Sequence, residues 1–253
     1  MNALNYTLAP HVDGCCVGSY VVLIDTKKDR YIGVPAPEST SLASCIDGWP
    51  KEIHGTLPSP VAIHTDQDAT ADSTRQLLDE LLAAGLLISS ASANARPPRA
   101  RAERAERALI EGYTEVPFTL KPRDIARFVM SLLQSRKLQR SFEIWVNHLR
   151  TRRADTSSAL QSRSFPSDPD MTATRHYLAV FRCIRPFFYG AKDACLFDSM
   201  VLAEFLHHYG IFPQVILGVA QDPFSAHCWV QDGPVVLNDD PLHVSQFTPI
   251  LVL

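Results

Sequence analysis

Residues 195–239 decide the fold of the second half of this 253-residue chain, and they read CLFDSMVLAEFLHHYGIFPQVILGVAQDPFSAHCWVQDGPVVLND. Apolar residues recur at helical spacing over 195–209, and Gly210 follows at the position where glycine commonly ends a helix. Apolar runs at 211–219 and 226–230 predict two strands. The stretch therefore predicts a helix followed by strands, as in an α+β domain.

Three residues in this stretch form a pattern typical of a thiol enzyme. Cys195 begins the predicted helix, His227 lies near the start of a strand, and Asp239 ends the next short strand. A cysteine attacks as the thiolate, and a helix N-terminus or a neighbouring imidazolium lowers its pKa. His227 could accept the thiol proton and Asp239 could orient the imidazole, provided that the turn at 231–234 folds the strands into a hairpin. Asp240 stands beside Asp239 and is the alternative acid.

Each of these residues also has an ordinary structural interpretation. A cysteine in an apolar helix is most often a small buried side chain, and a lone histidine or aspartate is commonly a surface residue. The three residue types in this order favour catalysis. A metal site built from Cys195, His227, Cys228 and His243 is conceivable, but the six cysteines include no Cys-x-x-Cys pair and no zinc-ligand spacing. We therefore expect no metal.

Several short motifs in the same stretch carry a family resemblance. They are Ala194-Cys195-Leu196, the helix up to Ile211, residues 219–224, Ala226-His227-Cys228-Trp229-Val230 and Val236-Leu237-Asn238-Asp239. Together they resemble the transglutaminase-like cysteine protease of lasso-peptide biosynthesis, the B protein. The resemblance implies a papain-like α+β fold and a Cys195–His227–Asp239 catalytic triad. Cys228 departs from the family, which more often has a small apolar residue there.

The first 90 residues predict a small sheet and helices. Strands are expected at 12–20, 20–26 and 30–34, with a turn at 26–29. Helices are expected at 38–46 and 73–84; Asp72 or Ser73 can cap the second helix and Gly85 can close it. The apolar stripe of that second helix consists of Leu77, Leu78, Leu81 and Leu82.

The motifs Val21-Val22-Leu23-Ile24-Asp25 and Asp29-Arg30-Tyr31-Ile32-Gly33-Val34-Pro35, with the leucine helix, resemble a winged-helix element of the PqqD type. That element recognises precursor peptides, so the resemblance implies that a leader peptide adds a strand to the third strand and lies against the last helix. The implied leader contacts are Arg30, Tyr31, Ile32, Gly33, Val34, Leu78 and Leu82. The alternative is that the leucines fill the core, which we expect for Leu78 and Leu81.

The two resemblances imply a PqqD-like leader-recognition domain at 1–90, a linker at 91–112 and a transglutaminase-like cysteine protease domain at 113–253. The later part of the linker tract, 101–109, is compatible with a helix. Beyond it we expect a helix or helix pair over 122–149, a polar loop at 151–170 and a helix at 174–188 that packs on the cysteine-bearing segment.

Composition excludes several classes of protein. The formal net charge of −3 argues against a general nucleic-acid binder. The sequence contains no run of eighteen apolar residues, so we expect no transmembrane helix. The N-terminal residues lack the charged and apolar regions of a signal peptide, and the cysteines fit reduced thiols. We expect a bacterial cytoplasmic protein that contacts neither nucleic acid nor membrane.

The two resemblances together imply a peptidase that binds the leader of a ribosomally made lasso-peptide precursor and removes it. The implied partner is an ATP-dependent, asparagine-synthetase-like cyclase that closes the macrolactam; cleavage itself needs no cofactor. Two alternatives stay open: an acyltransferase on the same triad, which passes the acyl group to an amine, and a non-catalytic module that only binds and delivers the leader.

Overall fold

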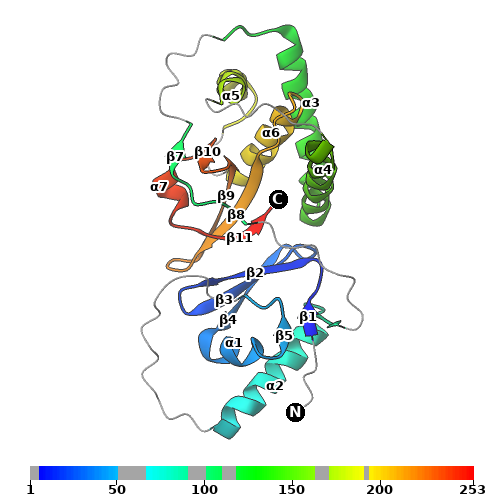
Figure 1. The fold of residues 1–253 in the computed structure, drawn as a ribbon, viewed down its shortest axis with the longest axis vertical. Helices are drawn as coiled ribbons and strands as arrows, with labels where there is room; N and C mark the ends of the chain where they lie inside the picture. The colour runs from blue at the N-terminus through cyan, green and yellow to red at the C-terminus, as the bar shows by residue number, and fades with distance from the viewer. Residues whose placement is uncertain (1–5, 51–66, 91–100, 110–117, 163–170, 191–193) are drawn as a thin grey trace. The chain divides into compact units, whose positions relative to one another are not determined.

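The computed structural model describes residues 6–50, 67–90, 101–109, 118–162, 171–190 and 194–253, and the chain folds as two compact units (Figure 1). The first consists mainly of residues up to Arg99 and the second mainly of residues from Ala100 onward. Within the described part of the chain, no helix has the length and apolar character needed to cross a membrane.

The described residues of the first unit form two three-stranded sheets and two helices. The larger sheet is antiparallel in the order β2-β3-β4, and the smaller has the order β5-β1-β6. The elements are β1 (Tyr6–Leu8), β2 (Val12–Val17), β3 (Tyr20–Asp25), β4 (Arg30–Pro35), α1 (Ala36–Leu42), β5 (Ile46–Asp47), α2 (Gln67–Ala83) and β6 (Leu87–Ser89). The predicted three-stranded sheet is thus confirmed, while the winged-helix assignment stays a prediction.

Local chemistry explains the turns of the larger sheet. The expected strand 12–20 ends earlier, at Val17, because Gly18 at φ +53° opens a turn into β3. The predicted turn at 26–29 is confirmed, and the buried carboxylate of Asp25 holds it. Its oxygens accept hydrogen bonds from the backbone N–H groups of Lys27 and Lys28, at 3.1 and 3.2 Å, and from Arg30 at 3.3 Å.

The helices of the first unit differ from the expected ones at their ends. Helix α1 ends at Leu42, four residues before the expected limit, and Ile46 belongs to β5. Helix α2 begins at Gln67, so Asp72 and Ser73 lie inside it and are not its caps. The first turns of α2, residues 67–72, are polar and lack the apolar periodicity that indicates a helix in the sequence. Its end is as predicted: Gly85 has φ +74°, and the Leu86 N–H bonds to the Leu81 carbonyl at 3.0 Å.

The second unit combines a five-stranded sheet with helices. The sheet has the order β11-β8-β9-β10-β7, and the helix at the centre of the unit, α6, packs on β8, β9, α3 and α5. The elements are β7 (Arg107–Ala108), α3 (Pro122–Leu138), α4 (Phe142–Ser162), α5 (Thr172–Ile184), a 3₁₀ turn at Arg185–Phe187, α6 (Cys195–His207), β8 (Gln214–Ala220), β9 (Ser225–Asp232), β10 (Val235–Val236), α7 (Pro241–Val244) and β11 (Thr248–Val252).

Helix α6 is buried on nearly every side, since all its residues from Asp198 to Leu206 are buried. A helix that is apolar all round belongs in the core of a domain. Phe205 of α6 joins Phe128, Phe181 and Phe188 in an aromatic cluster, with Phe128 at ring distances of 5.1 to 6.1 Å from the other three. Gly210 at φ +76° ends the helix, as the sequence predicts.

Two expectations for the second unit are wrong. Residues 101–109 do not form a helix: β7 pairs in parallel with β10, and the Gln231 side chain donates to the Glu103 carbonyl at 2.8 Å, so tertiary contacts override the helix propensity of this Ala, Arg and Glu tract. Residues 151–162 are not a loop but the second half of α4. The rest of that expected loop, 163–170, and most of the expected linker, 91–100 and 110–112, lie outside the described residues.

Candidate active site

Cys195 is the first residue of α6, so its thiol lies at the helix N-terminus as the sequence predicts. The side chain is half-buried and not part of a disulfide. The first backbone N–H groups of a helix have no intrahelical acceptor and carry the positive end of its dipole. This end of α6 is therefore suited to stabilise a thiolate.

Neighbouring groups lower the pKa of Cys195 below its ordinary value of 9.0. A hydrogen bond with His227 is the largest cause; burial opposes it, and the backbone N–H groups of Cys228 and Leu196 reinforce it. The groups that lower this pKa come from two elements, the helix that carries the thiol and the strand that carries the histidine.

His227 lies on β9, which pairs with β8 on one side and β10 on the other. Its partner on β8 is Gly218, and a Cβ at Gly218 would approach Trp229 and Phe247 to 2.8 Å. The glycine thus lets both aromatic side chains close over the strand beside the imidazole. The ring centroid of Phe247 lies 5.1 Å from that of His227, which limits the rotation of the imidazole.

Asp239 follows β10 and contacts His227 directly. Its Oδ2 is hydrogen-bonded to His227 Nε2, while its Oδ1 is bonded to His243 Nδ1 at 2.9 Å and accepts from the Asp240 N–H at 2.7 Å. The alternative acid, Asp240, caps α7 instead, since its side chain accepts from the Leu242 N–H at 2.7 Å. Because Nε2 of His227 is bonded to Asp239, the Nδ1 atom is the one left for Cys195.

The electrostatics of the three groups match a thiolate–imidazolium pair. Burial lowers the pKa of His227, but hydrogen bonds to Asp239 and Cys195 outweigh it and raise the pKa to about 9. Burial raises the pKa of Asp239, but hydrogen bonds from His227, His243 and the Asp240 backbone bring it down to about 2. Near neutral pH the aspartate is therefore ionised and the imidazole protonated.

Asn238 and Ser199 join the three segments that carry these residues. Asn238 accepts from the Val230 N–H of β9 at 2.8 Å and donates to the hydroxyl of Ser199 on α6 at 3.1 Å. Ser199 in turn donates to the Cys228 carbonyl of β9 at 3.1 Å. The helix of Cys195, the strand of His227 and the segment of Asp239 are thus fixed by one small polar network.

A second polar group anchors the first turn of α6. The buried Asp198 accepts from the Tyr189 hydroxyl at 3.0 Å and forms an ion pair with Arg185 at 3.3 Å. An acidic side chain in the first turn is favourable for a helix. The guanidinium of Arg185 neutralises the charge of the Asp198 carboxylate, so no unpaired negative charge from Asp198 lies near the Cys195 thiol.

Cys228, the departure noted in the sequence, has no reactive character. Its side chain is buried, and burial raises the pKa of its thiol well above the ordinary value. A thiol that stays protonated is a weak nucleophile. Cys228 contributes to the site through its backbone N–H, which helps to lower the pKa of Cys195.

Sequence reasoning assigned no role to Asn238 and Ser199, and it named His243 only as a conceivable metal ligand and not as a partner of Asp239. The spacing of four residues between Asp239 and His243 is a signal that could have indicated a contact, because α7 brings them together. Asn238 was within a family motif but had no assigned role. The Ser199–Asn238 contact spans 39 residues and has no local sequence signal.

The candidate leader contacts lie in the first unit. Arg30 to Val34 belong to β4, an edge strand of its sheet, with Tyr31 and Ile32 half-buried, Gly33 exposed and Val34 buried. The guanidinium of Arg30 forms an ion pair with Asp25 at 3.3 Å. Leu78 and Leu82 are partly buried and pack against the core of the first unit, beside the fully buried Leu81. The structure therefore gives these leucines a packing role.

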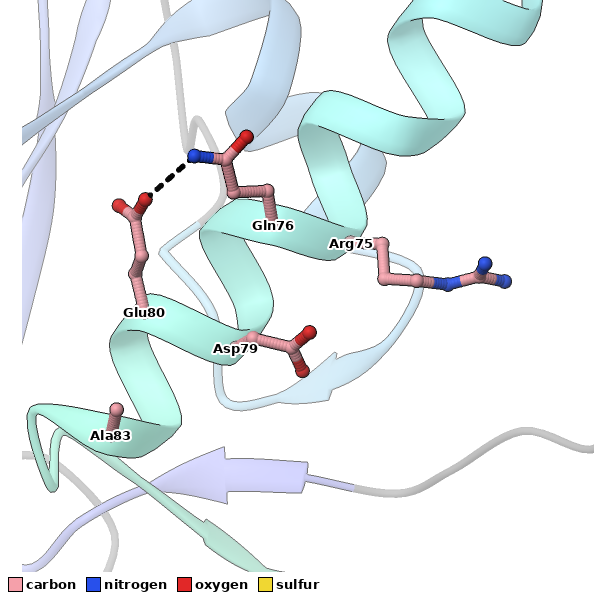
Figure 2. Close-up of a pocket in the computed structure, with 5 residues that line it drawn as sticks. All are labelled: Arg75, Gln76, Asp79, Glu80 and Ala83. Atoms are coloured by element: carbon pink, nitrogen blue, oxygen red, sulfur yellow. Dashed lines mark hydrogen bonds between the residues drawn. The ribbon is translucent and has the colours of Figure 1, made fainter.

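The outer side of α2 is polar (Figure 2). A shallow pocket of about 520 Å³ lies along it, lined by Arg75, Gln76, Asp79, Glu80 and Ala83, all from this one helix. Gln76 donates to Glu80 at 3.0 Å across one helical turn. Neither the predicted leader contacts nor the Cys195 site contributes to this pocket.

Comparison with known proteins finds a match for part of the second unit. Residues 135–252 match the model of the transglutaminase-like superfamily, and this range includes Cys195, His227 and Asp239. Neither the curated proteins nor the solved structures contain a significant match to the chain. Residues 135–252 are thus similar to transglutaminase-like domains, a scaffold on which catalysis usually depends on a cysteine.

Proposed function

We propose that the protein is a cysteine peptidase that removes the leader from a ribosomally made lasso-peptide precursor. The observation that carries this proposal is the arrangement of Cys195, His227 and Asp239: a thiol of lowered pKa at a helix N-terminus, an imidazole beside it, and a carboxylate on the far nitrogen of that imidazole. Nucleophile, base and orienting acid in this geometry are the requirements of acyl transfer through a thioester.

The reaction follows from the protonation states of the resting site. The Cys195 thiolate attacks the carbonyl carbon of the last leader residue, and the oxyanion forms at the N-terminus of α6, near the backbone N–H of Cys195. His227 gives its Nδ1 proton to the departing amine, which is the new N-terminus of the core peptide. The C–N bond breaks, and the leader remains as a thioester on Cys195.

Hydrolysis completes the cycle. His227, now neutral, takes a proton from water, the hydroxide attacks the thioester carbonyl, and the C–S bond breaks to give the leader carboxylate and the Cys195 thiolate. Asp239 keeps its charge throughout and stabilises each imidazolium that forms. No cofactor takes part in these steps.

The first unit supplies recognition in this proposal. A leader peptide would add a strand beside β4, an edge strand among the described strands, with Tyr31 and Ile32 giving selectivity through side-chain contacts. Binding on the same chain raises the effective concentration of the scissile bond near the thiolate. The freed amine then passes to an ATP-dependent, asparagine-synthetase-like cyclase, which is the proposed partner.

The superfamily match favours one alternative, an acyltransferase that passes the thioester to an amine and not to water. The attack and thioester steps are the same in both cases, so the triad geometry does not separate them. The nature of the acceptor does: a peptidase releases a free leader carboxylate, whereas an acyltransferase yields a leader amide when an amine is supplied.

The test is mass spectrometry of the precursor peptide after incubation with the wild-type protein or Cys195→Ala, with and without the cyclase and ATP, and with an added primary amine. We expect loss of the leader only with wild type, release of the leader as its acid, and loss of one further water when the cyclase is present. Cys183→Ala, which removes an exposed cysteine, is the control. Leader loss with Cys195→Ala, or with neither protein, would refute the triad; a leader amide would establish the acyltransferase.

A further inference from the structure

Asp239 is shared between two imidazoles, and this arrangement has a use beyond catalysis. His227, Asp239 and His243 each offer one donor atom, and the three atoms lie within 4.8 Å of one another. They come from β9, from the segment after β10 and from α7. Two histidines and one carboxylate that converge in this way are a ligand set for a divalent transition metal.

We propose that these three side chains bind a zinc-class divalent ion, which reversibly blocks the site. Imidazole nitrogen and carboxylate oxygen suit Zn²⁺, which takes three protein ligands and keeps a fourth position for water in open sites. Bond lengths of about 2.0–2.1 Å place tetrahedral ligand atoms roughly 3.3 Å apart, so the donors need to shift by about an ångström or less each. The ion takes the place of the hydrogen bonds that now join the imidazoles to Asp239, and the Nε2 proton of His227 is released to the solvent when the ion binds.

The surroundings of the three ligands favour such a site. Phe247 packs against both imidazoles, with ring centroids 5.1 Å from His227 and 5.4 Å from His243, and so holds the two rings near each other. The His227 and His243 rings are 4.7 Å apart. The His243 side chain is 47% exposed, whereas those of His227 and Asp239 are 13% and 19% exposed. An ion can therefore enter from the His243 side and keep a water on that side.

Cys195 is not a ligand in this arrangement. It meets His227 through the ring nitrogen that faces away from Asp239, whereas the metal would occupy the side where Nε2, Asp239 and His243 meet. This separates the proposed site from a conventional thiolate zinc site. The inhibitory consequence rests on the proposed function: an ion on Nε2 removes Asp239 from His227 and makes the imidazole a weaker base toward the thiol.

The experiment is calorimetric titration of ZnCl₂ into the tag-free full-length protein at neutral pH, comparing wild type, Cys195→Ala, His243→Ala and Asp239→Ala. We expect wild type and Cys195→Ala to bind one ion at this site with similar affinity, and His243→Ala and Asp239→Ala to bind it at least about tenfold more weakly. His176→Ala, at a histidine on α5, is the matched control and should bind as wild type does.

Co²⁺ in place of Zn²⁺ gives a second readout. The proposal expects a visible spectrum of low-coordinate Co²⁺ without a thiolate-to-metal charge-transfer band, and loss of that spectrum in His243→Ala that is folded by circular dichroism. Unchanged binding in both His243→Ala and Asp239→Ala, or loss of binding in Cys195→Ala, would overturn the proposal. Because binding is measured without substrate, a metal site can be confirmed or refuted whether or not the protein cleaves a leader.

Discussion

Two strands of this protein, β9 of the second unit and β4 of the first, offer opposite kinds of chemistry. β9 is paired with β8 along its length and with β10 at Gln231 and Asp232, and it serves the site chiefly through the His227 side chain, with the Cys228 N–H beside it. Among the described strands, β4 lies at an edge of its sheet and is paired with β3, and an edge is the position at which a further strand can add to a sheet. A reaction needs a few side chains fixed in place, whereas recognition of an extended peptide can be spread along a backbone.

This difference predicts two kinds of mutational behaviour. A change of one atom near β9 should have a large effect on kcat, because one carboxylate or one imidazole carries a whole step. A side-chain change on β4 should have a modest effect on KM, because backbone hydrogen bonds remain. The predictions below test this contrast, from the largest expected effect to the smallest.

Asp239→Asn should lower kcat/KM by roughly three orders of magnitude, because an amide can hold the imidazole in the wrong tautomer and cannot stabilise its charge. In the wild type, kcat/KM should rise as the Cys195 thiol ionises, below its ordinary pKa, and fall as His227 loses its proton near pH 9. Without the Asp239 charge the pKa of His227 falls, so the alkaline limb should move to lower pH. A pH–rate profile with an unmoved alkaline limb would contradict this role of Asp239.

Phe128→Ala should lower the free energy of unfolding by about 3–5 kcal/mol, since it leaves a cavity at the centre of the aromatic cluster under α6. Leu133→Ala on the same helix is the matched control, because that side chain is 58% exposed and should change stability by less than about 0.5 kcal/mol. Chemical denaturation measures both. Equal losses would mean that α3 does not pack on α6 through Phe128.

Tyr31→Ala and Ile32→Ala should each raise KM for the precursor about three- to tenfold and leave kcat nearly unchanged, because each removes one side-chain contact from a strand-like complex. Arg75→Ala on the polar side of α2 is the control and should change neither constant. Fluorescence anisotropy with a labelled leader peptide measures the same effect on binding. A loss of kcat in these variants, with KM unchanged, would contradict the assignment of recognition to β4 and catalysis to β9.

The sequence predicted those parts of the fold that have a strong local signal. The apolar run of α6 with Gly210 behind it, the turn at 231–234 and the turn after Asp25 are such signals, and the structure has each of them. The same patterns predicted that Cys195 begins a helix and that His227 lies on a strand. The order of these elements was therefore enough to predict that the two side chains act together.

The parts that sequence reasoning missed depend on contacts between distant segments. Residues 101–109 have the composition of a helix, but β7 forms because β10 is there to pair with it. The second half of α4 is polar, and apolar periodicity gives no sign of a polar helix. Likewise, His243 has no motif of its own; its importance follows only from the position of Asp239, whose second oxygen it contacts.

The most direct test of the central claim is intact-protein mass spectrometry of the wild-type protein, quenched in acid during turnover of the precursor peptide. The thiolate mechanism predicts an adduct equal in mass to the leader less one water, located on Cys195 by peptide mapping and released by hydroxylamine as a thioester should be. Leader cleavage that proceeds with no adduct on Cys195, or an adduct located on another residue, would contradict it.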